Sequence, residues 1–122
     1  MKLLNQLFYE EKRSKFYAFL YQIENEEDAK AILASLKEEH SKARHILRVL
    51  RYENKFGAMV SEASEDREPI SSMKKAKTFL ERDDIRNQGV YIVRYYGGTQ
   101  LGASHLDHVY FSLAMKLLGK KD

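Results

Sequence analysis

The chain has 122 residues, of which 43% are hydrophobic and 32% are charged, and its formal net charge is +3. This size and apolar content predict one folded domain over residues 1–122 and exclude a disordered chain, while the charge is too small to name a nucleic-acid partner. The absence of cysteine excludes disulfides and thiolate chemistry. The sequence has no apolar run near ~20 residues and no signal-peptide pattern, so we expect a cytoplasmic protein with no membrane partner.

The first third of the chain predicts a β-hairpin followed by a helix. Apolar and aromatic residues dominate 3–9 and 16–23, and the polar stretch 10–13 between them is typical of a turn. Asn25 is a good helix N-cap, and the three acidic residues after it lie where the helix dipole favours negative charge. The helix then has an apolar face with helical spacing, formed by Ala29, Ile32, Leu33 and Leu36.

Two further strands are predicted over 46–52 and 56–63, around a polar turn at 53–55. Side chains alternate between the two faces of a strand. We therefore expect His45 and Arg51 on one face of the first of these strands, together with Leu47 and Val49.

The second half of the chain predicts a short helix, a buried strand and a long helix. Ser71 or Ser72 is expected to cap the short helix, whose apolar side is Met73, Ala76 and Leu80. After a polar loop over 83–89, residues 90–93 form a strand and residues 94–98 a turn. The last helix buries Leu106, Val109, Tyr110, Leu113, Ala114 and Leu117, and ends at Gly119 among the cations Lys116, Lys120 and Lys121.

The predicted order is strand, strand, helix, strand, strand, helix, strand, helix. Short polar turns join the strands that follow one another directly, which is possible for antiparallel neighbours and not for parallel ones. The fold class is therefore predicted as α+β, with a mostly antiparallel sheet covered by helices.

The strongest candidate ligand site is the turn into the last helix, over residues 97–104. Gly97 and Gly98 allow close approach of a backbone to a ligand, free N–H groups at a helix start attract anions, and Arg94 is near in sequence. The pattern is neither a dinucleotide-binding fingerprint nor a P-loop. A simple tight turn is the alternative interpretation.

A second candidate is the basic start of the short helix, with Lys74, Lys75 and Lys77. Lysines in an early helical turn are unfavourable unless negative charge is near. A bound anion would supply that charge, and so would pairing with Asp66 and Glu68, which precede the helix. A third, weaker candidate is a metal site at His105 and His108, which share a helical face with Asp107 between them. No serine lies in a nucleophile motif.

Several motifs together resemble the IMPACT family, which includes the bacterial YigZ-type proteins. They are Ser14-Lys15-Phe16, Ala43-Arg44-His45, Asp66-Arg67-Glu68-Pro69 and, most specifically, Arg94-Tyr95-Tyr96-Gly97-Gly98-Thr99-Gln100-Leu101-Gly102 with Leu106 and Tyr110. The resemblance covers nearly the whole chain. It implies a fold like the second domain of ribosomal protein S5 and a role in regulating translation, in stress responses among eukaryotic members.

The chain departs from the family pattern in two places. The family motif D-G-E-P-x-G-T-A-G reads Asp66-Arg67-Glu68-Pro69-Ile70-Ser71-Ser72-Met73-Lys74 here, and a later Gly-Gly pair is also replaced. A Cβ disfavours positive φ and close backbone approach, so a ligand of these loops is expected to bind differently. Typical bacterial members carry a second, ferredoxin-like domain that is not found in these 122 residues.

The favoured hypothesis is a binding protein without catalytic activity, which acts on a protein of the translation apparatus or on the ribosome. An RNA- or phosphate-binding module is the alternative, and a hydrolase using His45, Asp66 or Glu68 is the third. No cofactor or metal is expected, and an exposed sheet edge leaves the oligomeric state open. The expected binding residues are His45, Arg51, Asp66, Glu68, Lys74, Lys75, Arg94, Tyr95, Gly97 and Gly98.

Overall fold

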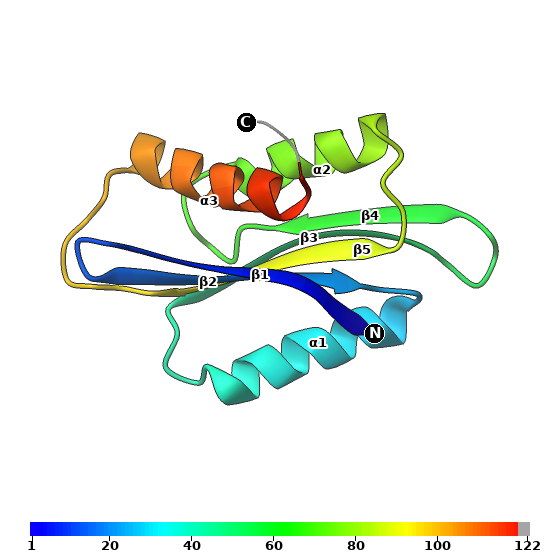
Figure 1. Cartoon of the computed structure of the whole chain (residues 1–122), viewed down its shortest axis with the longest axis horizontal. Coiled ribbons are helices and arrows are strands. Elements are labelled where there is room, and N and C mark those ends of the chain that lie inside the picture. The colour runs from blue at the N-terminus through cyan, green and yellow to red at the C-terminus, as the bar shows by residue number, and fades with distance from the viewer. Residues whose placement is uncertain (120–122) are drawn as a thin grey trace.

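The computed structural model describes residues 1–119 and confirms the α+β class (Figure 1). Its strands are β1 (Lys2–Glu11), β2 (Ser14–Gln22), β3 (His45–Glu53), β4 (Met59–Ser64) and β5 (Gln88–Tyr95). Its helices are α1 (Glu26–Glu39), α2 (Ser72–Arg82) and α3 (Ala103–Leu117). No helix within residues 1–119 is long and apolar enough to cross a membrane.

The strands form one sheet in the order β1-β2-β5-β3-β4, and all neighbouring strands are antiparallel. The last strand in the sequence is therefore the central strand of the sheet. Helix α1 covers one face, and α2 and α3 lie side by side over the other (Figure 1). Each face has its own apolar cluster, because side chains of the sheet alternate between the two layers.

The alternation predicted for β3 is confirmed. Leu47 and Val49 pack in the cluster beneath α2 and α3, whereas Ile46 and Leu50 pack in the cluster beneath α1. The strand is buried on both sides because β5 and β4 flank it and helices cover both faces.

The turn of the first hairpin is tighter than its sequence predicts, and the turn of the second is wider. In the first hairpin, β1 ends at Glu11 and β2 begins at Ser14, so the turn consists only of Lys12 and Arg13, both with positive φ. This is the left-handed pair that two-residue hairpin turns require. In the second, the turn is longer than expected and β4 begins at Met59, because the Asn54 side chain accepts hydrogen bonds from the N–H groups of residues 56 and 58.

Helix starts differ in how they are capped. Asn25 caps α1 as predicted, accepting a hydrogen bond from the Asp28 N–H at 2.8 Å. For α2, Ser71 occupies the capping position but its side chain makes no capping bond. The carboxylate of Glu65 accepts instead from the N–H groups of Met73 and Lys74 at 3.1 and 2.9 Å.

The C-terminal half otherwise follows the prediction, except that β5 is longer at both ends. It begins at Gln88, inside the loop expected over 83–89. The segment expected as a turn over 94–98 is partly strand, since β5 continues through Arg94 and Tyr95. Helix α3 buries its predicted stripe and is followed by Gly119 with φ of 72°. The predicted contributions of Lys120 and Lys121 lie outside the described residues.

Candidate functional site

A cleft of about 420 Å³ opens at the end of the sheet where β3 begins and β5 ends. Segments far apart in the sequence form its walls: the start of β3, the loop before α2, the end of β5 and the start of α3. We call it the Arg94 cleft, and its lining residues are Arg44, His45, Arg67, Glu68, Pro69, Arg94, Tyr96, Gln100, Leu101, Gly102, Ala103 and Leu106.

The strand register brings the polar floor of the cleft together. Arg94 of β5 lies opposite His45 of β3 on one side and opposite Phe16 of β2 on the other. Directly opposed side chains of antiparallel strands share a face, so His45 and Arg94 both point toward α2 and α3. The Arg94 guanidinium carbon also lies 5.7 Å from the centre of the Phe16 ring.

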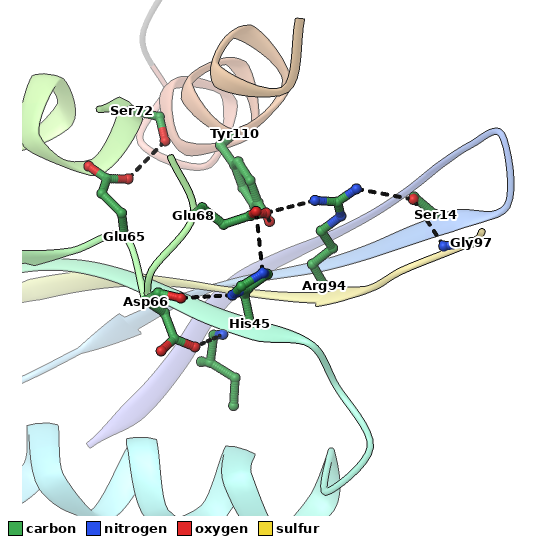
Figure 2. A network of polar contacts seen from close by, with 10 residues as sticks. Ser14, His45, Glu65, Asp66, Glu68, Ser72, Arg94, Gly97 and Tyr110 are labelled. Atoms are coloured by element: carbon green, nitrogen blue, oxygen red, sulfur yellow. Dashed lines mark hydrogen bonds and ion pairs between the residues drawn. The ribbon is translucent and has the colours of Figure 1, made fainter. Parts of the chain in front are cut away.

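Glu68 is the acceptor at the centre of this floor (Figure 2). One oxygen, Oε2, accepts from the Arg94 guanidinium at 2.8 Å and from the Tyr110 hydroxyl at 2.6 Å. The other oxygen, Oε1, lies 3.3 Å from Nε2 of His45. Three elements, β3, β5 and α3, therefore converge on one carboxylate of the loop before α2.

The Glu68–Arg94 pair is removed from solvent, with each side chain only 5% exposed. Burial, followed by the hydrogen bond to Glu68, raises the pKa of Tyr110, so its hydroxyl stays protonated and donates. Arg94 donates further to Ser14 Oγ at 3.4 Å, while its Nε atom has no partner in the described part of the chain. Buried ion pairs of this kind hold geometry more than they add stability.

The loop before α2 is fixed to the start of β3 through Asp66. Its carbonyl accepts from Nδ1 of His45 at 2.7 Å, and its carboxylate accepts from the Ile46 N–H at 2.7 Å. Asp66 and Arg67 both have positive φ, 47° and 69°. Arg67 stands where the motif D-G-E-P has a glycine. The loop therefore keeps a left-handed conformation here without the glycine that favours it.

The rim of the cleft is positively charged. Arg44 and Arg67 are exposed, and the Arg44 guanidinium carbon lies 4.8 Å from the centre of the Tyr96 ring. The first turn of α3 also opens here; its capping residue, Gly102, has φ of 82° and offers no side chain to the free N–H groups. The exposed arginines and the helix start give this opening the chemistry that suits a negatively charged ligand.

Gly97 and Gly98 each occupy a position that suits glycine, but for different structural reasons. A Cβ on Gly97 would lie 2.2 Å from the backbone carbon of Arg13, so only glycine fits against the first hairpin. Gly97 also donates its N–H to Ser14 Oγ at 3.2 Å. Gly98 has open space around it but a φ of 91°, which glycine adopts without strain.

Two of the expected binding residues lie away from the cleft. Arg51 shares the face of His45 but lies at the opposite end of β3, where it donates to Asp84 at 2.8 Å and to the carbonyl of Ile85 at 3.1 Å. Tyr95 points to the other face of the sheet, and its hydroxyl lies 2.6 Å from Nδ1 of His40.

Lys74 and Lys75 lie at the start of α2, beside the cleft rather than in it. Negative charge at these positions comes from Glu65 and Asp107. It does not come from Asp66 and Glu68, which the sequence offered as the alternative to a bound anion. Burial acts to raise the pKa of Asp107, but hydrogen bonds from the Lys75 ammonium and the Ser71 N–H outweigh it and hold that pKa below its usual value.

The histidines of α3 do not form a metal site. His105 bonds to Glu11 at 2.9 Å, while Asp107 points to α2, so their ligand atoms diverge. Within residues 1–119, no group of three or more potential metal ligands converges.

Sequence reasoning missed several residues of the cleft. Tyr110 was expected as core, and nothing in the periodicity of α3 shows that its hydroxyl reaches Glu68. Arg44 and Arg67 belong to the motifs that carry the resemblance, but neither was among the expected binding residues. Ser14 likewise appears only as a motif residue, although it links the first hairpin to Arg94.

Comparison with known proteins gives a consistent result. Residues 12–118 match the family model described as the Impact N-terminal domain. An IMPACT family member of Haemophilus influenzae is 33% identical over 100 residues, which are 81% of this chain and 48% of that protein. The chain therefore spans about half the length of this relative.

Two solved structures have a similar fold. A crystal structure of a hypothetical protein superimposes with a TM-score of 0.74 and 24% identity, covering 93% of this chain and 56% of the other. The two-domain translational regulator Yih1 superimposes with a TM-score of 0.56 and 21% identity, covering 95% of this chain and 46% of Yih1.

Proposed function

The chain belongs to the IMPACT family, and from this membership we propose that it is a binding protein without catalytic activity that regulates translation through the Arg94 cleft. The similar fold of Yih1, described as a translational regulator, supports this direction. The partner is a protein of the translation apparatus, reached in the cytoplasm. The residues that contact it are those at the exposed rim of the cleft.

One observation carries the proposal: the polar side chains of the cleft floor are occupied by one another. Glu68 accepts from Arg94 and Tyr110, and His45 is held between Glu68 and the Asp66 carbonyl. A catalytic acid or base needs a free position from which to exchange a proton with substrate. A floor that is internally bonded instead gives a fixed surface for recognition.

The chemistry of the rim suggests what the partner presents. Arg44 and Arg67 line the cleft beside the first turn of α3, which no side chain caps within residues 1–119, while Leu101 and Leu106 supply an apolar wall. Arginine pairs well with carboxylates. We therefore expect an acidic segment with an apolar anchor from a protein partner.

RNA is the second candidate partner, and the same rim is the observation that favours it. Two exposed arginines and a helix start are also a common combination for phosphate binding. The two candidates differ in their salt dependence, because each phosphate neutralised releases counterions and steepens the loss of affinity with salt.

The test is co-sedimentation of the chain with ribosomes of its source organism and, separately, with bulk RNA, each at low and high salt. Arg94 and Glu68 are unsuitable probes since both are buried in the fold. The informative variants are Arg44→Glu and Arg67→Glu at the exposed rim. The matched control is Lys30→Glu, which reverses one exposed charge on α1.

We expect salt-resistant association with ribosomes that falls at least about tenfold in the two rim variants, corresponding to about 1.4 kcal/mol, and is unchanged in the control. Equal, salt-sensitive binding to any RNA would favour the second candidate. Ribosome association that is indifferent to both rim charges would remove the Arg94 cleft from the proposal.

A further inference from the structure

Helix α3 begins at the wall of the Arg94 cleft without a side-chain cap. Its first internal bond joins the Leu106 N–H to the Gly102 carbonyl at 2.9 Å, so the N–H groups of residues 103–105 precede that bond. Within residues 1–119 no side chain caps these groups, and the first turn has no acidic residue. Because Gly102 and Ala103 line the cleft, the positive end of the helix dipole lies at its wall.

A second observation, independent of the helix, points to an acceptor from outside the chain. Arg94 lines the same cleft, and its side chain is only 5% exposed. Its terminal nitrogens donate to Glu68 and Ser14 (Figure 2), but its Nε–H has no acceptor within residues 1–119. Buried donors in folded proteins nearly always have an acceptor. We therefore expect a ligand of the cleft to bring acceptor atoms.

The lining of the cleft has more positive than negative charge. Among the described residues it includes three arginines and one acidic residue, Glu68, which pairs with Arg94. Arg44 and Arg67 are exposed and form no ion pair within residues 1–119. Two positive charges therefore lie unbalanced beside the start of α3. A single carboxylate or a phosphodiester would balance one of them, whereas a group with two negative charges balances both.

We propose that the Arg94 cleft binds a phosphate monoester on the segment that the protein partner inserts there. The inference rests on the proposed function for the partner and names the chemical group that is recognised. At pH 7 a phosphorylated side chain carries about −1.5 to −2 charges and has three acceptor oxygens. These oxygens accept from the first turn of α3 and from the rim arginines, a combination that binds phosphate well. Leu101 and Leu106 contact the apolar part of the segment.

The probe is N-acetyl-O-phosphoserine methylamide, titrated into the isotope-labelled chain and followed by NMR. We expect a dissociation constant of about 1 mM or below. Two monoanions, N-acetylaspartate methylamide and dimethyl phosphate, should bind at least about tenfold more weakly, since each balances only one arginine.

The charge on the probe can be changed without altering the protein sequence. The second pKa of a phosphoserine is about 6, so a change from about pH 7.5 to about pH 5 should weaken its binding severalfold. Dimethyl phosphate stays a monoanion and should not weaken. Proton uptake by His45 or Glu68 in the lining would make the cleft more positive and act in the opposite direction, while the arginines keep their charge.

A matched pair of variants at exposed Ala103 separates binding from folding. Ala103→Glu places a carboxylate in the first turn of α3, where the helix dipole favours it, so folding stability should be equal or higher. The affinity for phosphoserine should nevertheless fall at least about tenfold, because the new charge repels the phosphate. Ala103→Gln has a similar size without the charge and should stay within about threefold of the parent. Lys30→Gln on α1 should leave the affinity unchanged.

Phosphoserine that binds no better than the two monoanions, or equally well to the parent and to Ala103→Glu, overturns the inference. If ribosome association still depends on Arg44 and Arg67 in that case, the proposed function stands without it. Adenosine 5′-monophosphate tests a nucleotide source, and we expect no gain from its base because the Arg44 guanidinium already lies over the Tyr96 ring. Binding of this nucleotide about tenfold tighter than phosphoserine would overturn the assignment to a protein segment.

Discussion

Glu68 shows how a single carboxylate can fix a site. It takes one charged donor, Arg94, and one neutral donor, Tyr110, on the same oxygen. Removing two charges from water costs several kcal/mol per ion, and the attraction between them roughly offsets that cost. The energetic consequence appears when one partner is removed, because the remaining charge is then buried alone.

At this scale we predict that Arg94→Met lowers the free energy of unfolding by about 3–5 kcal/mol, since it strands the Glu68 carboxylate. Adding Glu68→Gln should recover part of the loss, because the buried charge is then gone. Urea denaturation of both variants measures this. Arg86→Met, at an exposed arginine, should stay within about 0.5 kcal/mol of the parent. A cost below about 1 kcal/mol for Arg94→Met would contradict the buried-pair description.

Helix α2 depends on acidic groups that other segments provide. It has no acidic residue in its first turn, although Lys74 and Lys75 lie there. Glu65 caps its N–H groups, and Asp107 of α3 bonds to Lys75 and to the Ser71 N–H. The element is thus completed by its neighbours, and Asp107 couples α2 to α3 beside the cleft.

For this element we predict that Asp107→Asn lowers the free energy of unfolding at pH 7 by about 1 kcal/mol, through loss of a charged hydrogen bond. The pKa of Asp107 is lowered in the folded state, so its contribution is present above the unfolded value near 4 and is lost as pH falls through the folded value. Denaturation from pH 7 to 3 should show the parent and variant converging in acid. A gap that does not narrow as the pH falls below 4 would contradict this assignment.

Local sequence patterns predicted most of the helices and strands. They did not predict how these elements are arranged in the sheet. Periodicity and the Asn25 cap located α1, and alternation assigned the faces of β3 correctly. No local signal places β5 between β2 and β3, because strand order depends on contacts distant in sequence. The wide β3–β4 turn was missed since it rests on the side-chain bonds of Asn54.

The residues of the candidate site were likewise predicted only in part from the sequence. Alternation put His45 and Arg51 on one face but carried no information on their separation along the strand. The resemblance supplied Glu68 and Arg94, which the structure brings to one cleft, and also Gly97 and Gly98, which are not among the residues lining that cleft. It also suggested Tyr95, whose side chain the pleat directs to the opposite layer.

For the whole molecule we predict a strong gradient of hydrogen exchange across the sheet. Residues 90–93 of β5 are fully buried and paired on both sides, so their amides should exchange only through global unfolding. Outward amides of the edge strand β1, including Gln6, should exchange at least about tenfold faster. Exchange measured by NMR tests this, and equal protection of β1 and β5 would refute it.

The central position of β5 has a consequence for folding during synthesis. Its neighbours β2 and β3 are translated early, but the strand that joins them is the last of the five to be made. Until residue 95 has left the ribosome, the nascent chain holds two separate hairpins whose inner edges have no partner. The sheet therefore closes late and in one step, and chaperones that protect unpaired strands have their longest opportunity to act on β2 and β3.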